Sequence, residues 1–319
     1  MRVTITDLDH ESHEIERRVA EAEDVEFLFL GGGVDAGLDP RVKGSAGLVV
    51  QYARIDAEVM DFLLPELKVI GRYGVGVDTI DLDAAEERGI VVVNVPDYGT
   101  QAVADHAIML ALAVARNLPA LQRVSQAGSM DVSPAAPIHQ YDHQVFGVLG
   151  FGRIGEATAI KARGLGFDVQ VCDIKFPEGT TEHDGFRVVD HATLYGTSDI
   201  LSLHIPMSDD NRNLINEQTL AQIKDGTILV NTARGGIADS DALVAALKSG
   251  KLLGAGLDVL GTEPCPPNHP LRDFERVILT PHSAFYSEES YSELKRRTMQ
   301  NTIDVLKGRG CPNIVVPRK

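Results

Sequence analysis

Apolar runs of strand length alternate with helical stretches along the first third of the chain. We predict strands at 2–6, 25–30, 47–51, 68–71 and 91–95. Helices are predicted at 11–23, where most residues are polar, and at 56–64. Strands that alternate with helices are typical of βαβ units, so this pattern predicts a parallel sheet.

A second series of the same kind begins at residue 145. It predicts a helix at 153–164 and strands at 145–149, 169–172, 201–204, 227–231, 256–259 and 277–280. A charged helix then runs from residue 287 towards 305, and 313–316 is a short terminal run. Two series of βαβ character indicate two related open sheets.

Residues 101–117 form a long helical stretch dominated by alanine, leucine and methionine, which Pro119 limits. The stretch is apolar on nearly every side, so we expect it to be buried and to connect two domains. The segment 128–143 is polar and contains prolines, and we expect it on the surface. The length of 319 residues also exceeds that of a typical single core. The predicted class is α/β, with two Rossmann-like, doubly wound parallel-sheet domains.

The composition argues against several classes of partner. A formal net charge of −16 repels phosphodiester backbones and anionic lipids, so we expect no nucleic acid and no membrane. Residues 1–10 lack the apolar core of a signal peptide, and we find no apolar run long enough to span a bilayer. Three scattered cysteines form neither a disulfide framework nor a metal-binding pair. We therefore expect a cytoplasmic location.

One pair of histidines, His139 and His143, has the spacing of metal ligands on a helix. Pro134 and Pro137 argue against a helix in this segment, and we see no third ligand nearby in the sequence. We therefore expect a solvated loop here and no metal ion.

A glycine-rich turn follows the strand predicted at 145–149. Gly150, Gly152 and Gly155 form a GxGxxG pattern that opens the next predicted helix. In dinucleotide-binding domains the first glycine permits a tight turn, the second lets the backbone approach the pyrophosphate, and the third lets the helix pack closely. Free N–H groups at the helix N-terminus also attract phosphate. The pattern alone is weak, but its position between a strand and a helix favours a dinucleotide site.

Asp173 directly follows the strand predicted at 169–172. Its carboxylate can accept hydrogen bonds from ribose hydroxyls and repels a 2′-phosphate, so NAD is favoured over NADP. Lys175 is a nearby cation that weakens this preference. The alternative is a structural glycine turn with a solvated aspartate at a strand end.

Arg234, Glu263 and His282 each come a few residues after a predicted strand of the second series. Because the carboxyl ends of parallel strands form the ligand crevice of an open sheet, we expect these side chains where a dinucleotide binds. Alone, each residue would more often be a surface ion pair or the end of a strand. Together, and with a dinucleotide motif upstream, they favour catalysis.

Reduction of a ketone by hydride needs this set of groups. Negative charge develops on the carbonyl oxygen, and His282 can supply the proton. The Glu263 carboxylate can orient the imidazole and favour its charged form. The Arg234 guanidinium can bind a substrate carboxylate through two parallel hydrogen bonds and polarise the adjacent carbonyl. We therefore interpret the set as a 2-oxo acid reductase site in which the cofactor carries the hydride.

Two further residues lie at the ends of predicted strands. Asp258 is a candidate to hold the nicotinamide carboxamide, and a turn-forming role is equally open. His204 lies close to Pro206 and either borders the cofactor or serves packing alone.

These motifs resemble those of the D-isomer-specific 2-hydroxyacid dehydrogenases. The resemblance rests on 147–155 (GVLGFGRIG), 229–236 (LVNTARGG), 256–259 (GLDV) with Glu263-Pro264, and 280–282 (TPH). Upstream, 74–81 (GVGVDTID) is similar to the substrate loop of the family, and 94–96 (NVP) precedes its interdomain helix. The likeness covers nearly the whole chain, and the combination of motifs is specific.

Within the family, Arg72 and residues 281–288 resemble the C-terminal-binding-protein branch. Phe285 stands where that branch has a tryptophan. The aromatic wall is kept but its size changes, so the substrate preference of the branch does not carry over.

The resemblance implies an NAD-binding Rossmann domain at 99–286, inserted into a flavodoxin-like substrate-binding domain at 1–98 and 287–319. It implies NAD as the cofactor, a small 2-oxo or 2-hydroxy acid as the substrate, and a homodimer. The expected catalytic residues are Arg234, Glu263 and His282. The residues expected to bind the cofactor are Gly150, Gly152, Arg153, Ile154, Gly155, Asp173, His204, Pro206, Thr232, Ala233, Arg234, Asp258 and His282.

The residues expected to bind the substrate are Tyr52, Arg72, Val75, Gly76, Arg234, His282 and Phe285. Val75 and Gly76 would act through their backbone N–H groups. Tyr52 could equally be a surface aromatic residue, and Arg72 a strand-end ion pair.

Two other functions stay open. The branch that this chain resembles contains NAD(H)-sensing co-repressors that keep the same Arg–Glu–His set, so an NAD(H)-sensing binding protein is one alternative. Arg72 adds a positive charge near the expected pocket, so a reductase of a dianionic, phosphonate-type oxo acid is the other.

Overall fold

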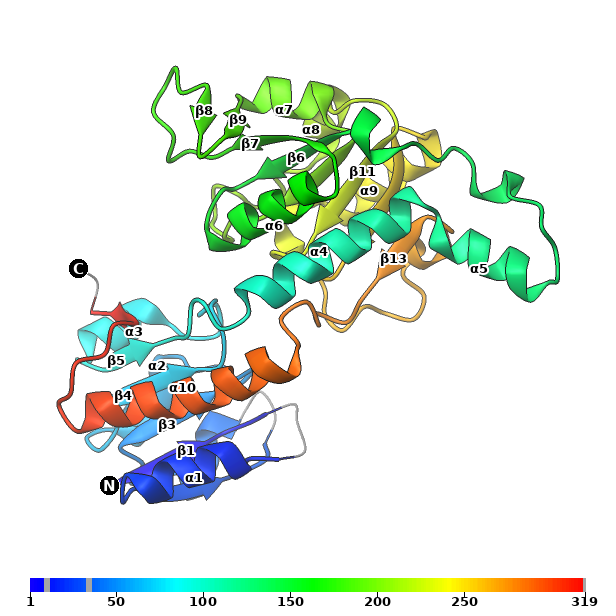
Figure 1. Cartoon of the computed structure of the whole chain (residues 1–319). Coiled ribbons are helices and arrows are strands. Elements are labelled where there is room, and N and C mark those ends of the chain that lie inside the picture. The colour runs from blue at the N-terminus through cyan, green and yellow to red at the C-terminus, as the bar shows by residue number, and fades with distance from the viewer. Residues whose placement is uncertain (9–11, 33–35, 318–319) are drawn as a thin grey trace. The chain divides into compact units, whose positions relative to one another are not determined.

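The computed structural model describes residues 1–8, 12–32 and 36–317. The chain divides into two compact units: Met1–Gly99 together with Ser287–Lys319 (unit 1), and Thr100–Tyr286 (unit 2). Each unit is built on a mostly parallel sheet with helices around it, as Figure 1 shows. The predicted α/β class with two doubly wound sheets is confirmed.

Over its described residues, unit 1 has a six-stranded sheet in the order β14-β5-β4-β3-β1-β2. The strands are β1 (Arg2–Ile5), β2 (Glu26–Phe29), β3 (Gly47–Val50), β4 (Val69–Arg72), β5 (Val91–Val93) and β14 (Ile314–Val316). The helices are α1 (Glu14–Ala22), α2 (Ala57–Leu63), α3 (Leu82–Glu87) and α10 (Glu288–Leu306), with short 3₁₀ turns at Ala36–Leu38 and Pro40–Val42. β14 alone among these strands is antiparallel to its neighbour. The order of β1 to β5 is that of flavodoxin-like sheets.

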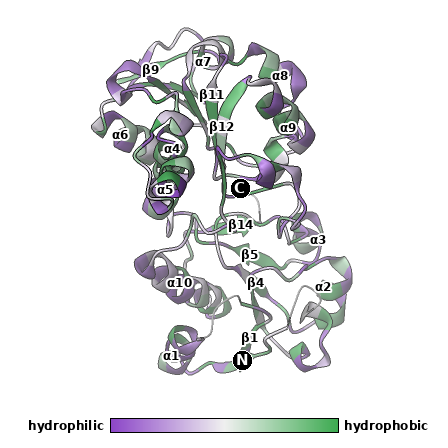
Figure 2. Cartoon of the chain, turned by 90° about the vertical axis from the view of Figure 1, so that its right-hand side faces the viewer, coloured by the Kyte–Doolittle hydropathy of each residue, from purple (hydrophilic) through white to green (hydrophobic). Residues whose placement is uncertain are grey.

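Apolar residues cover both faces of the unit 1 sheet, because successive residues of a strand point to opposite faces. Leu48 and Val50 of β3 pack with α2 and α3, whereas Val49 packs with α1 and α10. Figure 2 shows hydrophilic colouring on the outer surfaces of helices such as α3 and α10. The sheet is therefore the centre of a three-layer unit.

Unit 2, which the structure describes throughout, has an eight-stranded sheet in the order β13-β12-β11-β10-β6-β7-β9-β8. The strands are β6 (Val145–Leu149), β7 (Asp168–Cys172), β8 (Glu182–His183), β9 (Phe186–Val188), β10 (Ile200–Leu203), β11 (Thr227–Asn231), β12 (Leu252–Leu257) and β13 (Val277–Leu279). The helices are α4 (Thr100–Ala115), α5 (Leu118–Gln126), α6 (Arg153–Gly164), α7 (His191–Thr197), α8 (Glu217–Gln222) and α9 (Ser240–Ser249). The 3₁₀ turns are Ser133–Ala135, Tyr141–His143, Gly235–Ile237 and Pro270–Asp273. The strand order from β9 to β12 is that of the Rossmann fold.

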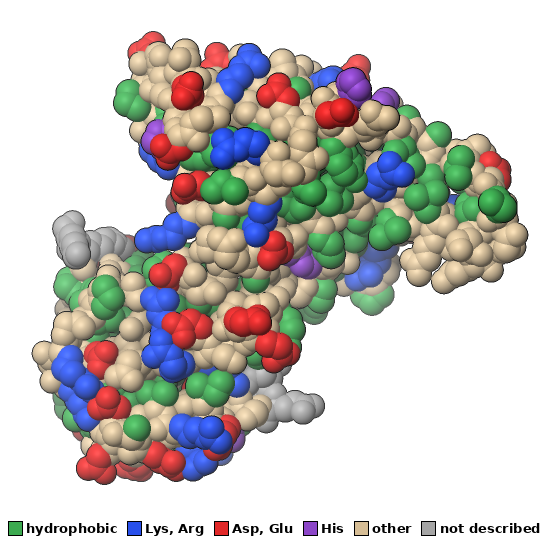
Figure 3. Space-filling view, viewed as in Figure 1, with side chains coloured by type: hydrophobic (Ala, Val, Ile, Leu, Met, Phe, Trp, Pro, Cys, Tyr) green, Lys and Arg blue, Asp and Glu red, His purple; other side chains and the backbone are tan. Residues whose placement is uncertain are grey.

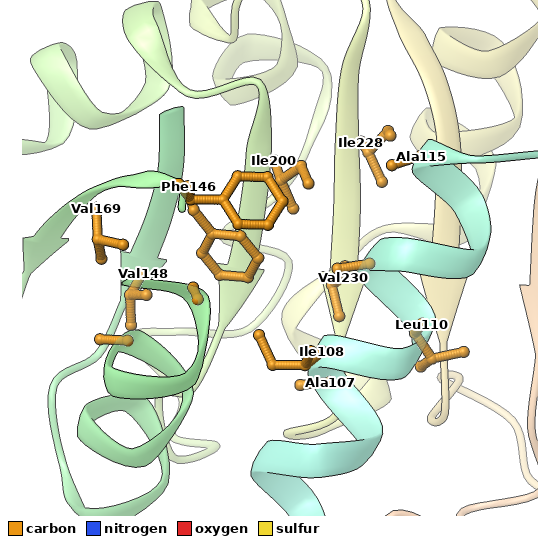
Figure 4. Packing of buried hydrophobic residues seen from close by; sticks show 14 of the residues in the cluster. Ala107, Ile108, Leu110, Ala115, Phe146, Val148, Val169, Ile200, Ile228 and Val230 are labelled. Carbon is orange, nitrogen blue, oxygen red and sulfur yellow. The ribbon is translucent and has the colours of Figure 1, made fainter. Parts of the chain in front are cut away.

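One face of the unit 2 sheet packs against α4 and α6, and the other packs against α7, α8 and α9. In Figure 4, Ile108 and Leu110 of α4 lie toward the sheet, which contributes Phe146, Val148 and Val230. Helices on both faces explain why these strands are apolar throughout rather than alternating.

The region around Pro119 differs from the prediction. α4 is apolar on nearly every side, as predicted, but it is not buried on nearly every side, because Met109 is 45% exposed. A second helix, α5, follows at once, and Pro119 lies in its first turn, where the missing N–H costs no hydrogen bond. Asn117 separates the two helices with a left-handed φ of 45°. Proline therefore starts a new helix here rather than a loop.

Several short elements were not predicted, namely α3, α7, α8, α9, β8 and β9. All except α9, which has ten residues, have seven residues or fewer, so their periodicity in the sequence is short. The helix predicted at 11–23 corresponds to α1, and residue 11 lies outside the described residues, as do residues 9 and 10 of the N-terminal segment.

Leu110 offers a test of the α4 packing. Leu110 is fully buried, so Leu110→Ala should lower the free energy of unfolding of unit 2 by about 2–5 kcal/mol in urea denaturation. Val132→Ala is the control in the same unit, since Val132 is 68% exposed and its truncation should cost less than about 0.5 kcal/mol. Equal effects of the two changes would contradict the packing described here.

Candidate active site

The carboxyl ends of β6, β7, β10, β11, β12 and β13 share one edge of the unit 2 sheet, because all these strands are parallel. The first residues beyond these strands are Gly150, Asp173, His204, Thr232, Asp258 and Thr280. All except Thr280 are predicted site residues. The topology therefore brings the candidate cofactor residues to one edge.

The glycine turn is tight at two of its three glycines. Gly150 has a φ of +92°, and a Cβ there would lie 2.6 Å from the backbone oxygen of His204. A Cβ on Gly155 would lie 2.0 Å from the backbone oxygen of Gly150. A Cβ on Gly152 would meet nothing within 4 Å. The first and third glycines serve packing, and the second leaves open space beside the backbone.

The N-terminus of α6 fits a phosphate group. Its N-cap, Gly152, has no side chain to accept from the N–H groups of the first turn, whereas Asp190 and Asp239 cap α7 and α9 in that way. Arg153 and Ile154 begin the helix, the former exposed and the latter half-buried. Uncapped first-turn N–H groups with adjoining space are what a pyrophosphate requires.

Asp173 ties the end of β7 to the glycine turn. One carboxylate oxygen accepts from the backbone N–H of Phe151 at 2.6 Å, and the other accepts from that of Lys175 at 2.8 Å. The Lys175 ammonium donates to the backbone oxygen of Phe151. Each carboxylate oxygen has a further lone pair, so Asp173 keeps acceptor capacity for ribose hydroxyls.

His204 lies beside the glycine turn. Its backbone N–H donates to Leu149, and its Nε2 lies 2.8 Å from the Ser202 hydroxyl. Burial lowers the pKa of His204 to about 4, so the imidazole is neutral at neutral pH. Pro206 is exposed, and its backbone oxygen accepts from the Asn211 side chain.

Thr232 carries a polar atom that its surroundings leave unsatisfied. The residue is 8% exposed, and its buried hydroxyl has no hydrogen-bond partner among the described residues. The adjoining turn is held by Asn231, whose side chain accepts from the N–H of Ala233 and donates to the backbone oxygen of Arg234. Buried polar groups rarely stay unpaired, so this hydroxyl fits a role toward a ligand.

His282 and Glu263 are in direct contact. The imidazole Nδ1 lies 2.7 Å from a carboxylate oxygen of Glu263, and the other carboxylate oxygen accepts from the N–H of Leu260 at 3.0 Å. Both side chains are more than a third exposed. The contact between His282 and Glu263 was predicted from the chemistry of the two side chains, not from their spacing in the sequence, and the structure contains it.

The charges around Glu263 favour its ionised form. Burial alone would raise the pKa of Glu263, but the hydrogen bond and charge of His282, with smaller help from Leu260 and Arg234, lower it. The carboxylate is therefore ionised at neutral pH, and this stabilising contact is lost only as the pH falls through the lowered pKa. The influence of Arg234 also indicates that its guanidinium lies near the pair.

Arg234 follows the turn after β11 in an extended backbone conformation. Its Nη1 donates to the backbone oxygen of Ala233 at 2.7 Å. The remaining N–H groups of a guanidinium can still serve a planar carboxylate.

Asp258 holds the turn that carries His282. Its carboxylate accepts from the Thr280 hydroxyl at 2.5 Å and from the N–H groups of Ser283 and Ala284, both at 2.9 Å. Its backbone oxygen accepts from the N–H of His282 at 2.8 Å. These contacts support the turn-forming role left open by the sequence. A role toward the nicotinamide carboxamide stays a prediction.

Thr280 and His106 were not predicted as site residues. The Nε2 atom of His106, on α4, lies 2.9 Å from the Thr280 hydroxyl and 3.5 Å from Asp258. His106 lies in a stretch that was predicted to be apolar on nearly every side, and its partners are far away in the sequence. The only available signal was a histidine among alanines and leucines.

In unit 1, Arg72 is the last residue of β4, and the other predicted substrate residues follow β3 or β4. Tyr52 is 45% exposed, and the half-buried Arg72 donates to the backbone oxygen of Tyr73. Val75 is 42% exposed, and its backbone oxygen accepts from the Asn94 side chain. Gly76 is half-buried. Phe285, the remaining predicted pocket residue, is half-buried in unit 2.

Asp7, at the end of β1, was also missed. Its buried carboxylate accepts from the N–H groups of Gln51, Tyr52 and Ala53 at 2.5–3.2 Å. It therefore fixes the backbone at Tyr52. An acidic residue directly after a strand was the signal in the sequence.

Among the described residues, no group of histidine, cysteine, aspartate and glutamate side chains is arranged to hold a metal ion. In the same part of the chain, no helix combines the length and apolar character needed to cross a bilayer. His139 and His143 lie in or next to the 3₁₀ turn Tyr141–His143, not on an α-helix.

Known proteins share these features. A profile described as "D-isomer specific 2-hydroxyacid dehydrogenase, NAD binding domain" matches residues 108–284. The glyoxylate reductase of Thermofilum pendens is 40% identical over 82% of this chain and 78% of its own length. The D-3-phosphoglycerate dehydrogenase of Archaeoglobus fulgidus is 37% identical over 86% of this chain, which spans 51% of that relative.

A solved structure has the same fold over the whole chain. The D-lactate dehydrogenase of Aquifex aeolicus, complexed with NAD and lactic acid, is 27% identical with a TM-score of 0.88 and covers 100% of both chains.

Asp173 allows a test of cofactor preference. Asp173→Asn keeps an acceptor for the Phe151 N–H but removes the negative charge, so the preference for NAD over NADP should narrow about tenfold, or roughly 1.4 kcal/mol. Steady-state kcat/KM with each cofactor measures this ratio. Asp190→Asn, at the cap of α7, is a control that should leave the ratio unchanged. An unchanged ratio in the Asp173 variant would refute the ribose role.

Proposed function

The chain belongs to the D-isomer-specific 2-hydroxyacid dehydrogenase family, and we propose that it transfers hydride between NAD(H) and a small 2-oxo or 2-hydroxy acid. The observation that carries this proposal is the 2.7 Å contact between His282 Nδ1 and Glu263, with Arg234 nearby. An imidazole fixed by a carboxylate beside a guanidinium is the set that reduction of a 2-oxo acid needs.

We assign cofactor binding to unit 2, and we propose that each unit contributes residues to substrate binding. In unit 2, Gly150, Gly152 and Gly155 with the N-terminus of α6 would hold the pyrophosphate, and Asp173 the adenosine ribose. The proposed cofactor set is completed by residues near the ends of the strands and the start of α6, namely Arg153, Ile154, His204, Pro206, Thr232, Ala233, Arg234, Asp258 and His282. When bound, NAD(H) supplies or accepts the hydride.

In this proposal His282 is the general acid in the direction of reduction. Because Nδ1 faces Glu263, Nε2 is the atom that gives its proton to the carbonyl oxygen. The ionised Glu263 fixes the plane of the ring and compensates the positive charge of the imidazolium. In the direction of oxidation, the same Nε2 takes up the proton.

Arg234 binds the acid group of the substrate and polarises its neighbouring carbonyl. Its Nη1 contact with Ala233 fixes the guanidinium next to the turn after β11. In unit 1, the N–H groups of Val75 and Gly76 are the proposed ligands of the substrate carboxylate. Tyr52 and Arg72 of unit 1 are proposed to contact the substrate, and the same role is proposed for Phe285 of unit 2.

Two substrate classes deserve separate consideration. The relatives named above act on a monoanionic acid, as glyoxylate reductase, or on a phosphorylated one, as D-3-phosphoglycerate dehydrogenase. The likeness to D-3-phosphoglycerate dehydrogenase favours a dianionic substrate as the alternative. Arg72 is the proposed positive charge that would bind the second negative group of such a substrate. A panel that contains glyoxylate, pyruvate and phosphohydroxypyruvate separates the classes.

The likeness to the C-terminal-binding-protein branch stays a prediction. Its functional consequence, an NAD(H)-sensing protein without catalysis, is the other alternative. NADH binding without turnover of any acid in the panel would favour it.

We further propose that the chain forms a homodimer through unit 2. Four large apolar side chains on neighbouring helices are 42–53% exposed: Met109, Leu118, Ile160 and Leu165. Figure 3 shows hydrophobic side chains gathered over the region of α4 and α5. Exposed apolar residues on adjacent elements are typical of subunit contacts.

His282→Ala tests the proposed chemistry. Loss of the general acid should lower kcat by about 100- to 10,000-fold, measured as the loss of NADH absorbance with the best acid of the panel. NADH affinity, measured by fluorescence, should change much less. His269→Ala is the control, because His269 caps a 3₁₀ turn elsewhere in unit 2. Near-normal turnover would remove His282 from the mechanism.

Ile160→Asp tests the dimer. A charge in the apolar contact should convert a species of twice 34.5 kDa into the monomer in light scattering. Ile174→Asp introduces the same change at a site that is 95% exposed and should leave the dimer intact. A wild-type monomer, or a dimer that persists in the Ile160 variant, would contradict the proposed interface.

A further inference from the structure

A chain of hydrogen bonds runs from α4 to the turn that carries His282. His106 Nε2 lies 2.9 Å from the Thr280 hydroxyl, which lies 2.5 Å from an oxygen of Asp258. The Asp258 side chain is fully buried, and that of His106 is 17% exposed. The proposed mechanism uses neither His106 nor Thr280, so their contacts need an account.

The direction of each bond follows from the acceptor at its end. A carboxylate only accepts, so the single proton of the Thr280 hydroxyl points to Asp258. The hydroxyl oxygen then accepts, and His106 Nε2 must be the donor. Burial lowers the pKa of His106 against the opposing effect of Asp258, so the imidazole is neutral with its proton on Nε2.

Asp258 links this chain of hydrogen bonds to the backbone of His282. Its side chain binds the N–H groups of Ser283 and Ala284, and its backbone oxygen binds the N–H of His282. His282 is thereby held in the left-handed region with a φ of 54°, which is strained for a residue other than glycine. Weaker anchoring of Asp258 would let the turn relax and move the imidazole.

We propose that His106 and Thr280 are positioning residues that set the orientation of the His282 imidazole through Asp258. This inference rests on the proposed role of His282 as the general acid. It assigns a function to a histidine on a helix that otherwise serves packing. Neither residue needs to touch the substrate, because both act on the backbone of the turn.

Thr280→Val removes the hydroxyl at nearly constant volume and is the main test. It should lower kcat by about 10- to 100-fold, since small misplacements of a catalytic group have effects of that size. KM for the acid and the NADH affinity should stay within about threefold. Thr280→Ser keeps the hydroxyl and should restore most of the turnover. Thr219→Val, which removes a hydroxyl that donates to Leu214 elsewhere in unit 2, should leave kcat unchanged.

His106→Phe tests the same chain from its other end and keeps the proposal testable if Thr280→Val fails to fold. It should lower kcat alone but add little in the Thr280→Val background, because both changes break one network. Additive losses, or a loss confined to KM, would overturn the inference, as would Thr280→Ser behaving like Thr280→Val.

Hydrogen exchange provides a readout that is independent of turnover. In the protein without cofactor or substrate, the amides of residues 282–284 should exchange faster in Thr280→Val and His106→Phe than in the wild type and Thr280→Ser. Unchanged exchange would overturn the inference. If the wild type reduces no acid while exchange responds as expected, the proposed reaction fails but the positioning of the turn stands.

Discussion

The candidate site depends on the parallel pairing of the unit 2 strands. Because β6, β7, β10, β11, β12 and β13 run in one direction, their carboxyl ends lie along one edge. A residue directly beyond any of these ends therefore reaches that edge, whatever its distance in the sequence. Helices on both faces of the sheet bury the strands, so the edge is also where polar side chains can meet a ligand. This constraint makes the site a property of the fold.

Buried aspartates then convert the flexible chain beyond a strand into a defined turn. Asp258 binds the N–H groups of Ser283 and Ala284, and Asp7 binds those of Gln51, Tyr52 and Ala53 in unit 1. In both cases the carboxylate accepts hydrogen bonds from backbone N–H groups that have no neighbouring strand to bind, because the sheet has ended. Unpaired N–H groups at such positions would be costly to bury, so the aspartates stabilise the turns as they orient them.

The sequence predicted the features that are local in the chain. The glycine pattern, Asp173 and the Arg–Glu–His set each follow a strand. The family resemblance, which rests on the glycine pattern and the Arg–Glu–His motifs, is confirmed. What escaped prediction depends on contacts between distant segments: His106 meets a residue 174 positions away, and Asp7 meets Gln51 across 44 positions. Pro119 was read as the end of a helix because a proline fits both the end of one helix and the first turn of another.

The backbone at His282 shows why such supports are needed. A glycine would adopt a φ of 54° without strain, but it would provide no imidazole. A histidine in an ordinary conformation would keep the ring but direct it elsewhere, away from its 2.7 Å contact with Glu263. Holding a histidine in the left-handed region therefore requires surrounding hydrogen bonds that outweigh the strain. Asp258 provides them, because its backbone oxygen binds the N–H of His282 and its carboxylate binds the N–H groups of the next two residues. Strain at this residue is the consequence of fixing the orientation of the proposed proton donor.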